Sequence, residues 1–398
     1  MTDFNKTRAM FDIPEGMIYL NGNSLGPMPK AAPQAMQSFL MDEWRTELIK
    51  GWNTKNWWMQ TNTLGDRVGQ LIGAEAGTTV VSDTLSIKVF QAVAAGLALV
   101  PDRRVILSDN GNFPTDLYMV EGLMKLRDKG YELRKPSPED VMNAINEDVA
   151  VVMLTEVDYR SGRKHDMQAI IKKAHDNGAV VVWDLAHSAG AIPVDVAAAN
   201  TDFAVGCTYK YINAGPGGPA FIYVAPRLLD VVEPALSGWY GHESPFEFDI
   251  DFRPMPGKIE RMRIGTPSIA SFSLLSAALD IWDEVDMNDL ETRSVELSEL
   301  FIKEVESRCE GVVFAGPREP ASRGSHVPFQ FEHGYACMQA LIANGVIGDF
   351  RAPDIMRFGI TPLFIGEKDI LSAVDVMETI LNNETWKEER FQVRSKVT

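Results

Sequence analysis

The sequence has little cysteine and no spacing that suits a metal ion. Three cysteines, Cys207, Cys309 and Cys337, stand far apart in 398 residues, and no C-x-x-C pair occurs. This usage argues against a disulfide framework and against a zinc site, and it favours a reducing compartment. We therefore expect a cytoplasmic protein without a metal centre.

Basic residues and long apolar runs are also scarce. Lysine and arginine number 38 against 55 aspartates and glutamates, so the formal net charge is −17. Such a surface repels a phosphate backbone, and no basic patch offsets it, so we expect no nucleic-acid partner. The apolar stretch 92–100 is too short to span a bilayer, and residues 1–16 lack the basic-then-apolar order of a signal peptide. We expect no membrane partner and a small-molecule substrate whose negative charge is met by a few placed cations.

The chain does have the composition of a folded enzyme and a regular alternation of elements. Hydrophobic residues make up 45% and charged residues 23%, which is typical of globular proteins. Apolar runs of strand length alternate with helical patterns, which indicates parallel β-α-β units and the α/β class. The predicted strands are 104–108, 149–154, 179–183, 203–207 and 219–224, and the predicted helices are 85–99, 114–129 and 166–177.

The two ends of the chain depart from this alternation. Further helices are predicted at 31–50, 58–72, 268–284 and 290–308. The last hundred residues mix both types, with strands predicted at 311–314, 326–331, 346–350 and 355–358 and helices at 335–344 and 367–382. We therefore predict a large domain of residues 51–284 and a smaller α+β domain formed by residues 1–50 and 285–398.

Two predicted strands end on residues that suit one cofactor. VVVWD ends on Asp184, and DFAVGCTYK ends on Lys210. Ligands of open parallel sheets bind beyond the carboxyl ends of the strands, so the acid and the amine should meet in one crevice. Pyridoxal phosphate (PLP) needs such a lysine for a Schiff base and an acid that keeps its ring nitrogen protonated. Either residue alone fits an ordinary cap or a solvated lysine, but the pair, followed by the glycine-rich turn 215–218, favours PLP.

Other segments could complete such a site. Thr84 and Ser86 lie at the start of a predicted helix, where amides and hydroxyls can hold a phosphate, although the same pattern is a common helix cap. Phe113 precedes another predicted helix and could stack on a planar ring or pack as a hydrophobic staple. Arg357 ends a predicted strand and has the side chain that clamps an α-carboxylate, with Arg351 as the competing choice.

A different enzyme class competes for the N-terminal region. Residues 22–26, Gly-Asn-Ser-Leu-Gly, match the G-x-S-x-G pattern of serine hydrolases, and Asp184 and His187 follow in the order of an α/β-hydrolase triad. That pattern requires a strand that turns sharply into a helix, and Pro27 and Pro29 hinder a helix from beginning there. A glycine-rich turn is the better interpretation, and the hydrolase is kept as an alternative.

Six segments together resemble a known family. YLNGNSLGPMP (19–29), NFPTD (112–116), WDLAHSAGA (183–191), TYKYINAGPGG (208–218), GWYGH (238–242) and RFGITPLF (357–364) are similar, in order, to segments of kynureninases, bacterial members above all. Kynureninases are PLP-dependent hydrolases of the aspartate aminotransferase fold (fold type I). The resemblance implies a large domain with a mainly parallel, seven-stranded sheet between helices, a smaller α+β domain, and a homodimer with active sites at the subunit interface. It also implies cleavage of the Cβ–Cγ bond of L-kynurenine to anthranilate and L-alanine, in tryptophan catabolism and the supply of pyridine nucleotides.

The resemblance assigns roles to individual residues. Lys210 would form the Schiff base, and Tyr209 would return a proton to the product carbanion. Arg357 would hold the substrate carboxylate, with Ser24 near the substrate. Asp184 would pair with the ring nitrogen. The other residues implied at the cofactor are Leu85, Ser86, Phe113, Pro114, Thr115, Asp116, Thr155, His187, Tyr209 and, from the neighbouring subunit, Trp239 and Thr266.

Departures from the family pattern bear on the substrate. Thr266 stands where animal enzymes tend to carry asparagine, and Trp57 lies where they carry histidine, which favours kynurenine over 3-hydroxykynurenine. Leu85 can offer a phosphate only its amide. Glu156 is unusual at its position.

Rival functions exist on the same fold. A cysteine desulfurase or selenocysteine lyase needs a mobile nucleophilic cysteine, and neither Cys309 nor Cys337 lies in a glycine-rich loop. An aminotransferase would differ in passing the amino group to a keto acid. A non-catalytic binding protein is disfavoured because the lysine, the acid and the arginine are all present.

Overall fold

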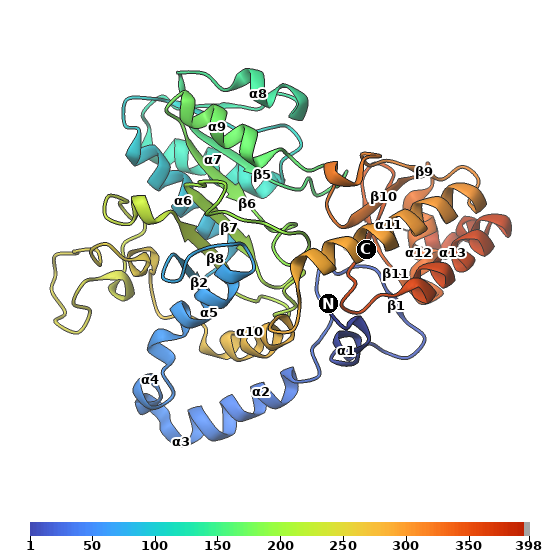
Figure 1. Cartoon of the computed structure of the whole chain (residues 1–398), viewed down its shortest axis with the longest axis horizontal. Helices are drawn as coiled ribbons and strands as arrows, with labels where there is room; N and C mark the ends of the chain where they lie inside the picture. Colours follow the sequence, from blue (N-terminus) through green and yellow to red (C-terminus); the bar gives the residue numbers. More distant parts are fainter. Residues whose placement is uncertain (394–398) are drawn as a thin grey trace.

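The computed structural model describes residues 1–393, and a seven-stranded sheet lies at the centre of its larger part (Figure 1). The strands are β2 (Thr79–Ser82), β3 (Val105–Leu107), β4 (Glu132–Arg134), β5 (Val149–Thr155), β6 (Val180–Asp184), β7 (Phe203–Cys207) and β8 (Ala220–Val224). Their order across the sheet is β2-β8-β7-β6-β5-β3-β4. From β7 to β4 all neighbours are parallel, whereas β8 is antiparallel to both β7 and β2.

Alternate residues of the central strands face two layers of helices. On one face, Val151 and Met153 of β5 belong to an apolar cluster with α6 (Leu85–Leu99) and α7 (Pro114–Arg127). On the other face, Val152 and Leu154 belong to a cluster with α5 (Gln60–Gln70), α9 (Met167–Asp176) and α10 (Ile269–Trp282). A mainly parallel sheet covered on both faces is typical of α/β proteins, so the predicted fold class is confirmed.

The C-terminal part carries a second sheet, which is antiparallel. Its strands are β9 (Val313–Phe314), β10 (His326–Gln330), β12 (Asp349–Arg351) and β13 (Ile355–Gly359), in the order β12-β13-β10-β9. The helices α11 (Met287–Arg308), α12 (Gly334–Ala343) and α13 (Glu367–Asn382) lie around it (Figure 1). The N-terminal α1 (Phe4–Ala9) and β1 (Ile18–Tyr19) join this part, since β1 pairs in parallel with β11 (Val346–Ile347).

Residues 31–50 do not form the single helix that their pattern predicts. The helix α2 (Ala32–Ser38) passes into a π-helical turn (Phe39–Trp44) and the short α3 (Arg45–Glu47). Leu48 then takes a positive φ of 51°, which stops the helix. With α4 (Gly51–Thr54), these elements form an extension that runs below α10, which we call the arm (residues 32–54; Figure 1).

Smaller differences concern the strands. The predicted strand 346–350 is interrupted at Gly348, and the predicted strand 219–224 is the antiparallel β8, which breaks the parallel alternation. β4 was not predicted because its three residues are partly exposed and show no apolar run. Two short helices, α8 (Val141–Ala144) and α14 (Glu389–Gln392), complete the chain. Within residues 1–393, no helix combines the length and the apolar character that a bilayer crossing requires.

Candidate active site

The carboxyl ends of the parallel strands bring the predicted acid and amine into one pocket. Asp184 is the last residue of β6, and Lys210 follows the end of β7 by three residues. Because β6 and β7 are parallel neighbours, their ends open at the same edge of the sheet. The pocket has a volume of about 310 Å³. Its lining residues are Asn21, Asn23, Ser24, Leu85, Phe113, Tyr159, Asp184, Ala186, His187, Tyr209, Lys210, Asp349, Arg351 and Arg357.

Asp184 lines the pocket, and the buried carboxyl group of Asp116 lies beside it. Oδ1 of Asp184 accepts a hydrogen bond from the amide of Ala186 at 2.8 Å, and Oδ2 lies 3.4 Å from the hydroxyl of Thr155. Burial raises the pKa of Asp184, and burial together with the charge of Asp184 raises the pKa of Asp116 well above its ordinary value. Two adjacent buried carboxyl groups do not both ionise at neutral pH. Sharing of one proton would leave the pair with one negative charge, and Asp184, which lines the pocket, would hold a ring nitrogen there.

The amine stands beside a neutral imidazole. Nζ of Lys210 lies 3.5 Å from Nε2 of His187. Burial, and then the charges of Lys210 and Arg357, hold the pKa of His187 well below its ordinary value, so its ring is neutral and its Nε2 can accept a hydrogen bond from the amine. Burial, and then the neighbouring Cys207, raise the pKa of Tyr209, so its hydroxyl stays protonated and is available as a donor.

The small sheet supplies the cationic end of the pocket. Arg357 on β13 and Arg351 on β12 both reach Ser24, with Nη2–Oγ distances of 2.9 and 3.3 Å. Arg357 also donates to the carbonyl oxygen of Tyr159, which follows β5. The N-terminal turn is held here because Gly26 donates to the carbonyl oxygen of Tyr209 at 2.8 Å, and a Cβ at residue 26 would lie 2.4 Å from the carbonyl oxygen of Lys210. Both predicted arginines therefore lie in the site.

Helix starts form the opposite side. Leu85 begins α6 and lines the pocket, and the first amides of a helix lack partners within it, so this side can hold an anion. Phe113 precedes α7, is partly exposed, and contacts Tyr159 edge to face at 5.2 Å between ring centroids. A pocket that combines an amine, a buried acid, a helix start and an aromatic wall fits PLP.

Eight predicted residues are not among those that line this pocket: Ser86, Pro114, Thr115, Asp116, Thr155, Trp57, Trp239 and Thr266. Trp57 is buried in the aromatic cluster beside the arm, where its Nε1 donates to Glu43 at 2.7 Å. Trp239 packs against Trp58 at 5.4 Å between ring centroids, and Thr266 is exposed before α10. None of these last three lines the pocket of its own chain.

Sequence reasoning missed several residues of the site. Tyr159 follows the end of β5, as Lys210 follows β7, so the rule about strand ends could have found it. Asp349 lies two residues before Arg351 in β12, at the end of the predicted strand 346–350. His326 on β10 has its ring 5.6 Å from that of His187, and burial and Arg357 lower its pKa to about 3. Nothing in the sequence around His326 pointed to the site.

The geometry argues against two of the alternatives. The hydroxyl of Ser24 donates to the carboxylate of Asp349, and His187 faces Lys210, so the serine–imidazole contact of a hydrolase is not formed. Cys309 and Cys337 are both buried, and burial raises their pKa values to about 11 and about 12. Neither thiol lines the pocket, so neither is placed to act as the nucleophile of a desulfurase.

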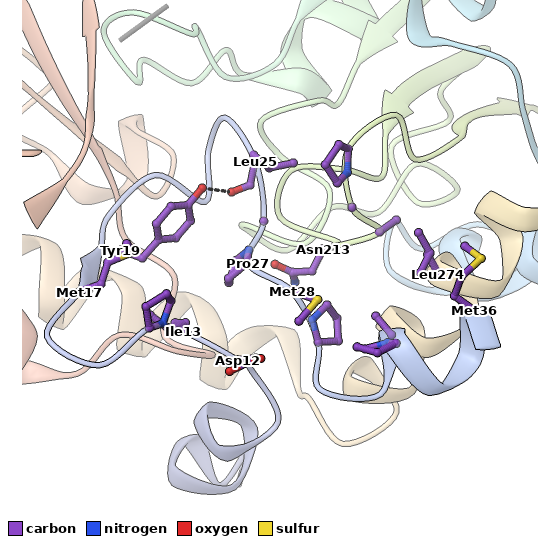
Figure 2. A pocket seen from close by; sticks show the side chains of 18 residues that line it. Asp12, Ile13, Met17, Tyr19, Leu25, Pro27, Met28, Met36, Asn213 and Leu274 are labelled. Atoms are coloured by element: carbon purple, nitrogen blue, oxygen red, sulfur yellow. Dashed lines mark hydrogen bonds between the residues drawn. The ribbon is translucent and has the colours of Figure 1, made fainter. Parts of the chain in front are cut away.

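A separate apolar groove of about 480 Å³ lies behind the N-terminal turn (Figure 2). Met28, Met36 and Leu274 line it, and the hydroxyl of Tyr19 donates to the carbonyl oxygen of Leu25 at 2.8 Å across one end. Lys210, Asp184 and the two arginines are absent from its lining. The groove therefore lacks the groups that the chemistry requires.

Glu156 is buried directly behind Asp184. Its amide donates to the carbonyl oxygen of Asp184 at 3.1 Å, and burial raises the pKa of its carboxyl group to about 7, against the opposing effects of Ser188 and Lys164. A raised pKa in the folded state gives stability that is present below the unfolded-state value of 4.5 and is lost as the pH rises through 7.

Glu156→Gln should therefore stabilise the protein at alkaline pH only. The raised pKa of Glu156 corresponds to a gain in the free energy of unfolding, on this substitution, of about 3 kcal/mol at pH 8.5 and of little at pH 5. Urea unfolding at both pH values measures the difference, with the exposed Glu139→Gln as the matched control. An equal loss of stability of Glu156→Gln at both pH values would show that burial does not destabilise the ionised carboxylate of Glu156.

Solved structures of low sequence identity share the fold. A cysteine desulfurase from Thermococcus onnurineus NA1 superposes with a TM-score of 0.80 at 19% identity, covering 95% of this chain and 98% of that chain. A cysteine desulfurase from Escherichia coli gives a TM-score of 0.78 at 21% identity, covering 96% and 99%. These similarities establish the fold, and the predicted fold type I architecture is confirmed.

Relatives of higher identity establish the family. The family model described as the kynureninase C-terminal domain matches residues 290–377. A kynureninase from Pseudomonas fluorescens is 47% identical, covering 98% of this chain and 95% of the relative. A kynureninase from Burkholderia pseudomallei (strain 1106a) is 46% identical with the same coverage. The resemblance found in the motifs is confirmed, and the chain belongs to the kynureninase family.

Proposed function

We propose that this chain is a PLP-dependent hydrolase that uses water to cleave L-kynurenine into anthranilate and L-alanine. The observation that carries the proposal is the pocket itself, in which Lys210, Asp184 and Arg357 converge in a chain 47% identical to a kynureninase. An amino-acid substrate needs all three groups: an amine to exchange with, an acid beneath the ring and a clamp for its carboxylate.

The pocket supports a set of cofactor contacts as part of this proposal. Asp184, supported by Asp116 and Thr155, would hold the ring nitrogen, and His187 would contact the cofactor beside Lys210. Leu85 and Ser86 at the start of α6 would hold the phosphate. The aromatic face comes from Phe113, with Pro114 and Thr115 beginning the helix behind it.

Each remaining group has a task in moving charge or protons. When bound, PLP supplies an electron-accepting ring that stabilises negative charge on the substrate carbons. The amine of Lys210 is placed to accept the proton from the α-carbon of the substrate. The neighbouring His187 stays neutral, so the proton remains on the amine and does not pass to the imidazole. Tyr209 keeps its hydroxyl protonated and can donate to the carbon that leaves as alanine. Arg357 and Ser24 would fix the α-carboxylate at the opposite end.

We further propose a preference for kynurenine over 3-hydroxykynurenine. With PLP bound, L-kynurenine should release fluorescent anthranilate, and kcat/KM should be at least ~10-fold higher for kynurenine than for the 3-hydroxy form. Thr266→Asn, the residue of animal enzymes, should reduce this ratio, with Thr63→Asn on the exposed side of α5 as control. A chain that releases no anthranilate from either compound would refute the function, and equal kcat/KM values would refute the preference.

The site becomes complete in a homodimer, in our proposal. Trp239 is 39% exposed and Thr266 is exposed, so both are free to reach the pocket of a second copy. Exposed apolar side chains gather on the arm and on the loop after Trp239, where a partner would cover them. These residues are Leu40, Met41, Trp44, Leu48, Ile49, Phe246, Phe248 and Ile250. Light scattering should give twice the mass of the 44.1 kDa chain, and a fully active monomer would contradict the proposal.

Domain limits, compartment and pathway complete the proposal. We place the domain boundary between α10 and α11, with residues 51–284 forming the large domain and residues 1–50 and 285–398 the small one, which limited proteolysis can test. Three buried cysteines without disulfide bonds are compatible with the cytoplasm, which cell fractionation can test. The products suit tryptophan catabolism and the supply of pyridine nucleotides, which feeding labelled tryptophan can trace.

A further inference from the structure

A carboxylate already occupies the cationic end of the pocket. Asp349 on β12 lies directly opposite Arg357 on β13 across the small sheet. Nε of Arg357 donates to Oδ1 of Asp349 at 2.8 Å, and Nη2 donates to Oδ2 at 2.5 Å. Arg351 reaches the same Oδ2 at 2.9 Å. One aspartate therefore bridges both guanidinium groups that could meet a substrate carboxylate.

This carboxylate stays charged. The side chains of Asp349 and Arg357 are 2% and 1% exposed. Burial alone would raise the pKa of Asp349, but the charge and hydrogen bonds of Arg357 and the charge of Arg351 outweigh burial and lower it. The hydroxyl of Ser24 also donates to Asp349. At neutral pH this end of the pocket therefore holds two positive charges and one negative charge.

The remaining single positive charge limits what can bind. The α-carboxylate of an amino acid neutralises it, whereas a second carboxylate would lie near Asp349 without a free cation. Arg357 also has most of its donors engaged, since it donates to Asp349, to Ser24 and to the carbonyl oxygen of Tyr159. In a buried site an unpaired charge is costly, so selectivity by charge is strong there.

We propose that Asp349 is a specificity-determining residue of the carboxylate site: it cancels one of the two arginine charges, so that the pocket accepts amino acids with one carboxylate and rejects dicarboxylic amino acids. The proposal rests on the proposed function, because it assumes an amino-acid substrate at this end of the pocket. A purely structural role as an ion pair between β12 and β13 would make no distinction between ligands.

Binding of two non-cleaved probes tests the proposal without reference to turnover. L-Alanine carries one carboxylate and L-aspartate carries two, and each can be titrated into the PLP-loaded protein through the visible absorbance of the cofactor. In Asp349→Asn, the ratio of the dissociation constant of L-aspartate to that of L-alanine should fall at least ~10-fold relative to wild type. The matched control is Asp354→Asn, which removes the same charge from an exposed carboxylate bonded to Gln330, and it should leave the ratio unchanged.

A second variant keeps the proposal testable if Asp349→Asn does not fold. Arg351→Gln removes a positive charge from a more exposed side chain, and it should move the ratio in the opposite direction. The charge-balanced double variant Asp349→Asn/Arg351→Gln should return it toward the wild-type value. An unchanged ratio in folded Asp349→Asn, or a fall of the ratio in Arg351→Gln, would overturn the proposal. Wild-type protein that binds both probes but releases no anthranilate would instead refute only the proposed function.

Discussion

Replacing Lys210 with alanine should abolish the absorbance of covalently bound PLP and reduce the turnover of kynurenine at least ~10³-fold. The reason is that Lys210 is the amine of the pocket, 3.5 Å from His187, and that Asp184 lines the same pocket. Anthranilate fluorescence and a visible spectrum of the loaded protein measure the two effects. Lys172→Ala is the matched control, because this lysine forms an exposed ion pair with Asp176 on α9.

The two measurements separate loss of chemistry from loss of folding. Folded Lys210→Ala should keep the circular dichroism of wild type, because its side chain is not part of either apolar cluster. Turnover within a few-fold of wild type in this variant would contradict the account, and so would normal absorbance of bound cofactor.

Replacing Asp184 with asparagine should reduce kcat by about 10²–10³-fold and leave covalent attachment of PLP in place. The amide removes the negative charge that Asp184 shares with Asp116 but keeps the size of the side chain, so the ring nitrogen loses the acid that holds its proton. Turnover of kynurenine and the visible spectrum of the same sample measure both effects.

Asp176→Asn is the control for this substitution, since it changes the same charge at the exposed end of α9. Near-normal kcat in Asp184→Asn would mean that Asp116 alone supplies the charge. Loss of covalent attachment would mean that Asp184 mainly positions Lys210.

The parts of the site on parallel strands could be predicted from the sequence. β6 and β7 are buried apolar runs, so the sequence pattern indicates where each strand ends. Because ligands bind beyond the carboxyl ends of parallel strands, the pattern also predicts that Asp184 and Lys210 lie together. The role of Asp349 could not be predicted in the same way. Its position depends on the register of β12 with β13, which places it opposite Arg357, and on the N-terminal turn that brings Ser24 to both.

The arm shows the other limit of sequence reasoning. Its amphipathic pattern predicts one helix over 31–50, but Leu40, Trp44 and Ile49 stay exposed in one chain, and the helix stops at Leu48. An amphipathic sequence pattern indicates that the apolar side chains will be covered, but it does not indicate whether the same chain or a second chain covers them. For the same reason, Trp239 and Thr266 could be assigned to the cofactor only through the family resemblance, because they lie outside the pocket of their own chain.

Reduction of the PLP-loaded protein with sodium borohydride, followed by peptide mass mapping, shows which lysine carries the cofactor. The reagent fixes the cofactor on whichever lysine carries it. We expect that one peptide, the one containing Lys210, gains the mass of the reduced cofactor, and that prior incubation with L-alanine lowers this gain. Labelling of another lysine, or no labelled peptide in a protein that cleaves kynurenine, would contradict the assignment of this pocket as the active site.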